Sequence, residues 1–204
     1  MARNGVDIGK GSYGSVRLQD CGKIVIKYPL SPDERTKTLF KRECQILEPL
    51  DHPNIVKYLG IQDKDQKGEE KFGITMEYCE RGDLEEVIFD PKMTYSMKWI
   101  LSGASQLFDA LAYLSERKLT HRDIKPSNIF LKEDFSLKLG DFGCVTLVAD
   151  STASGTFNRG TLRYLSPPQY DIAKENPNDD QRMISPKNDI YSLGLTLWEM
   201  VLRE

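Results

Sequence analysis

The chain has 204 residues, of which 39% are hydrophobic and 29% are charged, and this composition excludes collagen-like and largely disordered proteins. The net charge of −3 disfavours a nucleic-acid partner, since nucleic-acid-binding proteins normally carry a basic excess. No apolar run reaches the roughly 18 residues of a membrane span. The first five residues, MARNG, lack the apolar core of a secretory signal peptide. The four cysteines include no Cys-x-x-Cys pair, which disfavours zinc and disulfide frameworks and favours a cytosolic location.

The first eighty residues favour a β-rich lobe that contains one helix. Alternating or β-branched apolar residues predict strands at 16–18, 24–26, 55–61 and 72–76, with a charged tip at 63–70. Apolar residues at helical spacing predict a helix over 33–47, which Pro49 ends.

The chain beyond Gly82 favours an α-rich lobe. Apolar residues recur every three or four positions over 96–118, which predicts a long amphipathic helix. The other predicted elements are strands at 129–131 and 137–139, a long loop over 144–188 and a helix, buried on all sides, over 190–201. The predicted fold is therefore α+β in two lobes, 1–78 and 79–204.

A glycine-rich segment opens the first lobe. Gly9, Gly11 and Gly14 form a G-x-G-x-x-G pattern, but a strand follows it, whereas a dinucleotide-binding turn opens a helix. The pattern predicts a hairpin tip whose backbone closes over phosphates, with Val16 beside a purine. The alternative is a plain flexible turn.

A lysine and a glutamate in the first lobe form a second candidate pair. Lys27 ends a predicted strand, and Glu43 lies 16 residues later on the predicted helix. A strand cation and a helix carboxylate can grip nucleotide phosphates together. The alternative is two unrelated surface charges, which is the commonest state of both residue types.

The second lobe contains the most specific motifs. The segment HRDIKPSN, residues 121–128, precedes Asp141-Phe142-Gly143, and a predicted strand pair separates them. Phosphoryl transfer needs a carboxylate that orients the attacking hydroxyl and oxygen ligands for magnesium. Asp123, Asn128 and Asp141 supply these groups, and Lys125 can contact the transferred phosphate.

These motifs resemble the eukaryotic protein kinase family, serine/threonine type, and the likeness runs from about Ile8 to the last residue. Lys125, and Gly160-Thr161 before Tyr164, resemble serine/threonine kinases and not tyrosine kinases. The Glu-Tyr-Cys segment and the turn after it are weakly similar to the mitogen-activated kinase kinase kinases and their relatives. The resemblance implies an enzyme that uses ATP and magnesium.

The resemblance also implies roles for individual residues. Asp123 would orient the substrate hydroxyl, with Lys125, Lys27 and Glu43 as further catalytic residues, and Asn128 and Asp141 would bind magnesium. The nucleotide would contact Gly9, Gly11, Gly14, Val16, Val25, Lys27, Met76, Glu77, Cys79 and Asp83.

Partners follow from the same resemblance. The chain would act on a protein substrate and would be regulated by an upstream kinase at the loop 144–161, where Arg122 would meet an added phosphate. Candidate acceptors are Thr146, Ser151, Thr152, Ser154 and Thr156, and for each the alternative is an ordinary polar loop residue. Thr161 is expected to be a structural contact. The expected location is cytoplasmic, with the nucleus as an alternative.

The sequence departs from the family pattern in three places. Val25 replaces the usual alanine beside adenine, and Gln169 replaces a glutamate that pairs with a later arginine. The chain also ends at Glu204, near the helix that resembles the central helix of the family, so we expect an incomplete second lobe. If nothing covers the apolar faces of Leu193, Leu197, Trp198 and Val201, we expect marginal stability or aggregation.

The leading hypothesis is an ATP-dependent serine/threonine protein kinase. The alternative is a nucleotide-binding but inactive regulatory or scaffolding module, because the second lobe is expected to be incomplete. A dinucleotide-dependent dehydrogenase is disfavoured by the strand after Gly14.

Overall fold

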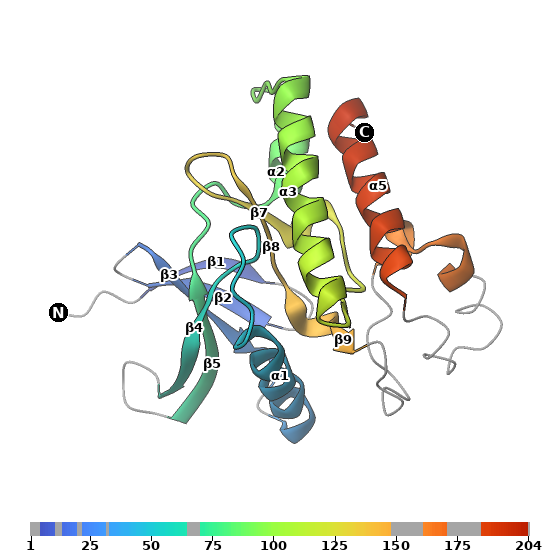
Figure 1. Ribbon diagram of the computed structural model, residues 1–204. Coiled ribbons are helices and arrows are strands. Elements are labelled where there is room, and N and C mark those ends of the chain that lie inside the picture. Colours follow the sequence, from blue (N-terminus) through green and yellow to red (C-terminus); the bar gives the residue numbers. More distant parts are fainter. Residues whose placement is uncertain are drawn as a thin grey trace.

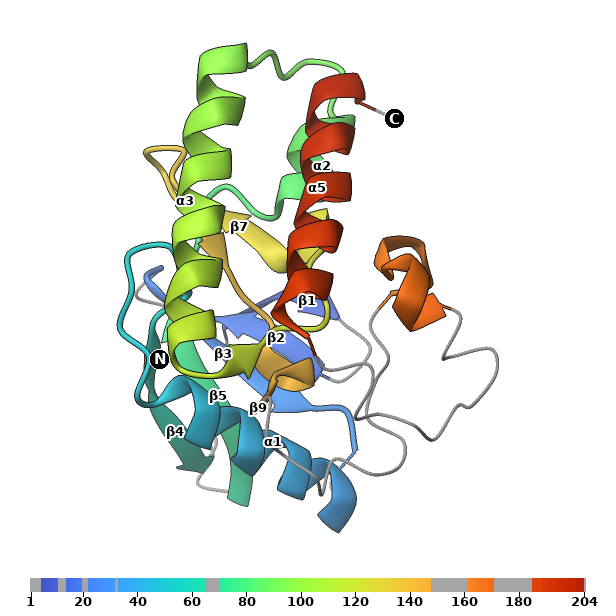
Figure 2. The same ribbon diagram turned by 45° about the vertical axis from the view of Figure 1, so that its right-hand side comes forward.

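The computed structural model describes residues 5–10, 14–19, 22–31, 33–64, 70–147, 161–170 and 185–203. In Figure 1 a curved sheet lies at the lower left, with α1 (Glu34–Leu47) below and beside it. Helices α3 (Met97–Glu116) and α5 (Pro186–Leu202) lie side by side at the upper right, and Figure 2 shows the same arrangement. The fold is α+β with a β-rich and an α-rich lobe, as predicted.

The sheet has five antiparallel strands in the order β1-β2-β3-β5-β4. They are β1 (Val6–Lys10), β2 (Gly14–Leu18), β3 (Ile24–Pro29), β4 (Tyr58–Lys64) and β5 (Glu70–Glu77). Val16 pairs with Lys27, and Val25 pairs with Met76. Directly paired residues share a face, as do residues two apart on one strand. These four predicted nucleotide contacts therefore lie on one face of the sheet.

The predicted helices 33–47 and 96–118 are confirmed to within two residues as α1 and α3. Each begins where a short polar side chain accepts a hydrogen bond from a backbone N–H of the first turn, which satisfies a donor that the helix itself leaves unpaired. These capping residues are Asp33 for α1 and Ser96 for α3, and Asp83 caps the short helix α2 (Leu84–Phe89) in the same way.

Short elements complete the α-rich lobe. The predicted strands 129–131 and 137–139 are confirmed as the hairpin β7 (Ile129–Leu131) and β8 (Leu137–Leu139). A second pair, β6 (Leu119–Thr120) with β9 (Thr146–Leu147), was not predicted because two residues show no periodicity. Single 3-10 turns cover Pro126–Asn128, Phe142–Cys144 and Leu162–Tyr164.

The predicted strand at 55–61 is wrong in its first half, since β4 begins at Tyr58. The backbone of residues 54–56 bonds across to Leu139 of the other lobe instead: Leu139 N donates to Asn54 O (2.8 Å) and Val56 N donates to Leu139 O (2.9 Å). This segment joins the lobes, so its apolar residues are buried without belonging to the sheet.

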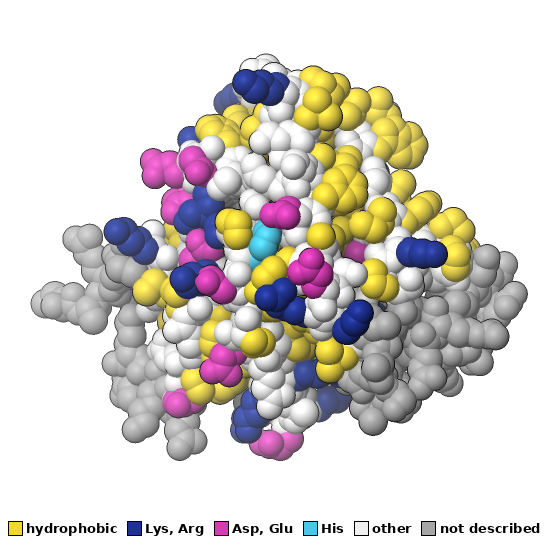
Figure 3. Space-filling model, viewed as in Figure 1, with side chains coloured by type: hydrophobic (Ala, Val, Ile, Leu, Met, Phe, Trp, Pro, Cys, Tyr) yellow, Lys and Arg dark blue, Asp and Glu magenta, His cyan; other side chains and the backbone are white. Residues whose placement is uncertain are grey.

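The expectation that the last helix is buried on all sides is also wrong. Leu193 and Met200 of α5 are buried, but Trp198 is 59% exposed and Val201 is 49% exposed. Phe108 of α3 is 43% exposed. Figure 3 shows hydrophobic side chains gathered at the upper right, where Figure 1 places α5. The two helices therefore pack along one side and leave apolar side chains on the surface.

A continuous apolar core connects the two lobes. It includes Phe40 and Leu47 of α1, Ile74 of β5 and Leu107 of α3, and it extends to Met200 of α5. Such a core fixes the lobes against each other and holds the polar residues between them in place. None of the helices in the described ranges combines the length and the apolarity that crossing a bilayer needs.

Candidate active site

Lys27 lies at the centre of a buried ionic cluster between the lobes. Its Nζ is 2.8 Å from Glu43 Oε1 and 3.0 Å from Glu43 Oε2 on α1, and 2.8 Å from Asp141 Oδ1. The Lys27 and Glu43 side chains are only 9% and 4% exposed. The structure therefore pairs the predicted lysine and glutamate and adds Asp141 to them, with α1 close against the sheet.

The charges of this cluster stabilise one another. Burial by itself would lower the pKa of Lys27, but the carboxylates of Asp141 and Glu43 outweigh it and raise that pKa above its ordinary value. The charge of Lys27 lowers the pKa of Asp141, against the opposing effect of burial. Lys27 is therefore a cation and Asp141 an anion at neutral pH.

Asp123 is the centre of a second polar cluster. Its Oδ1 accepts hydrogen bonds from Thr161 N (2.9 Å) and Thr161 Oγ1 (3.1 Å). Its Oδ2 accepts one from Asn128 Nδ2 (2.8 Å) and lies 3.1 Å from Lys125 Nζ. Lys125 Nζ also donates to Thr161 Oγ1 (2.8 Å), so Thr161 is a structural contact of this loop. The carboxylate is thus held in one orientation, as a group that must align a hydroxyl requires.

The two clusters are connected through the backbone. Gly140 N donates to Asn128 O (2.9 Å), which ties the loop of Asp123 to the residue before Asp141. His121 Nε2 bonds with Gly140 O (3.0 Å), and the His121 ring stacks edge-on against Phe142 with centroids 5.1 Å apart. His121 is fully buried, so it is a packed structural residue.

Two oxygen donors near these clusters fit a magnesium ion. Asn128 uses its amide nitrogen for both bonds to Asp123, which leaves the amide oxygen as a hard donor. Asp141 bonds Lys27 through Oδ1, and its side chain is 33% exposed. Within the described ranges no three His, Cys, Asp or Glu side chains form a ready-made metal cage. Magnesium commonly binds through one or two protein oxygens together with substrate phosphates, so the donor set suits it.

Asp189 of α5 anchors the catalytic loop, residues 121–128, a role that sequence reasoning missed. Its Oδ2 accepts from His121 N (2.7 Å) and its Oδ1 from Arg122 N (2.8 Å). Arg122 has φ +72°, a left-handed conformation that costs free energy for a non-glycine residue. The buried carboxylate therefore holds a strained turn directly before Asp123.

Replacement of Asp189 by Ala is expected to lower the free energy of unfolding by about 3 kcal/mol. Two buried N–H groups would lose their acceptors, and each unsatisfied group costs about 1–3 kcal/mol. Asp189→Asn keeps one acceptor oxygen, so about half of the loss is expected. Urea unfolding of the three proteins measures both values. A change below about 0.5 kcal/mol for Asp189→Ala, the range of ordinary surface substitutions, would contradict this role.

The predicted nucleotide contacts line the sheet and the linker between the lobes, residues 77–83, which runs from the end of β5 to the start of α2. Gly14 lies where a Cβ would come within 2.7 Å of Tyr28 O, so the backbones approach closely there. Val25 and Cys79 are buried. Asp83 caps α2, since its Oδ1 accepts from Glu86 N (3.0 Å), and its contact with the nucleotide stays a prediction. Gly11 lies outside the described residues.

The loop predictions are tested only in part. Of the candidate acceptors, Thr146 is described: it is buried in β9, and its Oγ1 accepts from Arg122 Nη1 at 3.4 Å. Ser151, Thr152, Ser154 and Thr156 lie outside the described residues. Gln169 is buried, and its Oε1 accepts from Ser166 N (3.1 Å), so the amide oxygen has a local donor. Burial raises the pKa of the Cys144 thiol to about 12, which makes it an unreactive thiol.

Comparison with known proteins decides the family. The model of the family described as protein kinase domain matches residues 3–204. The chain belongs to the protein kinase family. The match includes both lobes of this kinase domain and every residue of the two polar clusters.

The similar proteins are serine/threonine kinases. The probable serine/threonine-protein kinase nek2 of Dictyostelium discoideum is 33% identical over 206 residues, which is 95% of this chain and 46% of that protein. The putative mitogen-activated protein kinase kinase kinase 7-like of Drosophila melanogaster is 33% identical over 203 residues (97% and 48%). Human serine/threonine-protein kinase Nek2 is 35% identical over 208 residues (95% and 44%). The kinase domain spans about half the length of these relatives.

Proposed function

We propose that this kinase domain transfers the γ-phosphoryl group of ATP to serine and threonine hydroxyls of protein substrates. The observation that carries the proposal is the Asp123 carboxylate, held by Thr161, Asn128 and Lys125 and tied through the backbone to the Lys27–Asp141 cluster. Asp123 offers a carboxylate that orients a hydroxyl. The Lys27–Asp141 cluster offers a cation for the phosphates and an oxygen ligand for the magnesium ion that accompanies them.

In the proposed reaction the substrate hydroxyl donates a hydrogen bond to Asp123. The bond from the hydroxyl oxygen to the γ-phosphorus forms while the bond from that phosphorus to the β–γ bridging oxygen breaks. The hydroxyl proton passes to Asp123, and ADP leaves. Lys125 brings positive charge to the transferred group, so positioning and charge neutralisation lower the barrier more than base strength does.

The nucleotide would lie between the lobes. Lys27 would contact the α- and β-phosphates, and Asn128 and Asp141 would hold the magnesium ion. Bound magnesium would neutralise the charge that develops on the phosphates. Met76, Val16 and Val25 share one sheet face and would pack on the adenine, whose edge would meet backbone groups of Glu77 and Cys79. Gly9, Gly11 and Gly14 would cover the phosphates.

Regulation is proposed at the loop 144–161. An upstream kinase would add a phosphate to one of its hydroxyls, and Arg122 would bind that phosphate. Because Arg122 directly precedes Asp123, such a contact would act on the orientation of the catalytic loop. The proposed location is the cytoplasm, with the nucleus as an alternative.

The test is transfer of label from γ-labelled ATP with magnesium to a generic basic protein and to the chain itself. We expect label on serine and threonine, its loss on chelation of magnesium, and its loss in Asp123→Ala. Label that persists in Asp123→Ala would point to a contaminating kinase. Stabilisation by ATP without transfer, worth about 2.7 kcal/mol at a hundredfold excess over Kd, would indicate the inactive binding module instead.

A further inference from the structure

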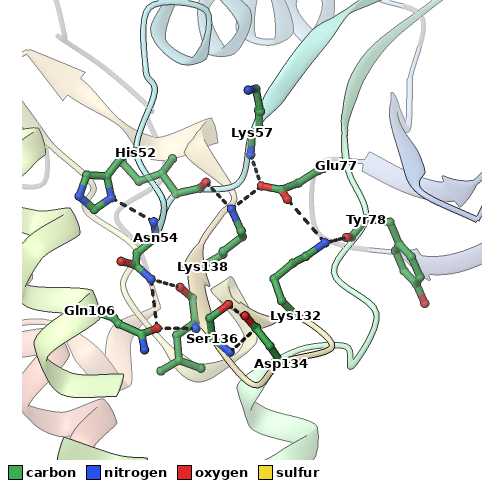
Figure 4. A network of polar contacts seen from close by, with 12 residues as sticks. His52, Asn54, Lys57, Glu77, Tyr78, Gln106, Lys132, Asp134, Ser136 and Lys138 are labelled. Carbon is green, nitrogen blue, oxygen red and sulfur yellow. Dashed lines mark hydrogen bonds and ion pairs between the residues drawn. The ribbon is translucent and has the colours of Figure 1, made fainter. Parts of the chain in front are cut away.

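The linker between the lobes is held from outside the proposed nucleotide site by two lysines of the β7–β8 hairpin. Figure 4 shows Lys132 and Lys138 reaching from this hairpin towards Glu77 and Tyr78, where β5 passes into the linker. We refer to Lys132 and Lys138 as the hairpin clamp. No catalytic or nucleotide-binding role was predicted for either lysine.

Lys138 joins the linker to the loop before β4. Its Nζ lies 2.7 Å from Glu77 Oε1 and donates to Ile55 O at 3.4 Å. Glu77 Oε1 also accepts from Lys57 N at 2.8 Å. The Lys138 and Glu77 side chains are 13% and 19% exposed, so solvent screens this pair less than a surface salt bridge. Glu77 is thus fixed from both lobes.

Lys132 acts directly on the linker backbone. Its Nζ donates to Tyr78 O at 2.7 Å and to Glu80 Oε1 at 2.9 Å, and lies 3.6 Å from Glu77 Oε2. Glu80 Oε2 in turn accepts from Glu133 N at 3.1 Å. Hydrogen bonds to an ionised donor are the stronger kind, so the Tyr78 carbonyl is firmly oriented.

The planarity of the peptide bond carries this orientation to the other side of the linker. The Tyr78 carbonyl and the Cys79 N–H belong to one peptide group, and in a trans peptide they point in opposite directions. A lysine that holds the carbonyl towards the hairpin therefore directs the Cys79 N–H away from it. The Cys79 backbone is one of the two linker groups that the proposed function assigns to adenine, together with that of Glu77.

We propose that the hairpin clamp positions the nucleotide, by fixing the peptide groups of the linker in the orientation that binds adenine. The inference rests on the proposed function. Preorganised polar groups bind more tightly because less conformational freedom is lost on binding. The clamp lysines touch neither nucleotide nor substrate in this scheme, so they are positioning residues that act on affinity and leave the chemical step unchanged.

The test compares Lys132→Met and Lys138→Met with the unmodified chain. We expect the Kd for ATP with magnesium, measured by calorimetry, to rise about five- to tenfold in each variant, as the loss of a charge-assisted hydrogen bond predicts. The KM for ATP should rise in parallel, and kcat should stay within about twofold. A merely structural role would lower the melting temperature and kcat together without this split.

Lys57→Met is the matched control. Lys57 belongs to the same network but bonds Glu77 through its backbone N, and its side chain is exposed. Its Kd for ATP should equal that of the unmodified chain. Lys138→Arg, which keeps the cation, should recover most of the affinity. If Lys138→Met does not fold, Glu77→Gln replaces it, because that variant removes the charge of the partner and keeps its shape.

The outcomes separate this inference from the proposed function. No ATP binding by the unmodified chain would overturn both. Binding by the unmodified chain with an unchanged Kd in both clamp variants would overturn the clamp alone. In a double-mutant cycle, Glu77→Gln with Lys138→Met should weaken binding no more than either change alone. Fully additive losses would show that Lys138 does not act through Glu77.

Discussion

Replacement of Lys27 by Met is expected to lower the rate of phosphoryl transfer at least about 100-fold, the effect of removing one preorganised charge-stabilising group. The Lys27 ammonium is the shared partner of Glu43 and Asp141, at 2.8 Å from each. Without it, two carboxylates face each other in a buried site, and the pKa of Asp141, which Lys27 now lowers, should rise. Magnesium would then compete with a proton for Asp141.

The stability of Lys27→Met should fall by less than the roughly 3–5 kcal/mol that breaking a buried ion pair costs. The reason is that burial already raises the pKa of Glu43, so this carboxylate can take up a proton and avoid an unpaired charge. Lys41→Met, at an exposed position of α1, is the control and should change neither activity nor stability. A transfer rate for Lys27→Met within threefold of the unmodified rate would exclude the proposed role.

Replacement of Asp123 by Asn is expected to lower the transfer rate by about 10²–10⁴, with the Kd for ATP changed by less than threefold. Both carboxylate oxygens of Asp123 accept hydrogen bonds, from Thr161 on one side and from Asn128 on the other. An amide has one acceptor oxygen and cannot take up the substrate proton. Its NH₂ would also face an N–H donor, so the side chain would lose its orientation.

Asp109→Asn is the matched control for Asp123→Asn. Asp109 is an exposed aspartate of α3, so the same isosteric change there should leave transfer unaffected. Comparison of ATP binding and transfer in the same preparation separates catalysis from folding. Equal rates in Asp123→Asn and Asp109→Asn would contradict the role of Asp123.

The elements that local chemistry determines were predictable from the sequence. Helices α1 and α3 begin at capping residues, Asp33 and Ser96, and bury apolar stripes, so their ranges follow from pattern and capping alone. The two strands of the β7–β8 hairpin were predicted to the residue from their short apolar runs. The family motifs brought together Lys27 and Glu43, which lie 16 residues apart and meet in the structure.

What the sequence left open depends on contacts between distant segments. Ile55 and Val56 are β-branched and apolar, as in a strand. The backbone of Val56, however, bonds to Leu139 in the other lobe and not to the sheet. Asp189 and the catalytic loop lie 67–68 residues apart and meet only in the folded chain. Lys132 and Lys138 have no pattern that distinguishes them from surface lysines. Their contacts with the linker form only because the folded chain places the β7–β8 hairpin against the linker.

The sequence pattern of α5 predicted more burial than the structure shows. A helix that is apolar on all sides normally indicates burial, because water is a poor solvent for such surfaces. In this structure, however, Trp198 and Val201 are exposed. The apolar composition of α5 therefore did not predict which of its sides packs against the rest of the protein.

The most direct test of the central claim is the single-turnover rate of γ-phosphoryl transfer to a generic acceptor protein at saturating ATP and magnesium. The account predicts phosphate on serine and threonine, formed together with an equal amount of ADP, at a rate that falls about 10²–10⁴ in Asp123→Asn. Saturating ATP binding by the unmodified chain without phosphate on the acceptor, or equal rates in both proteins, would contradict it.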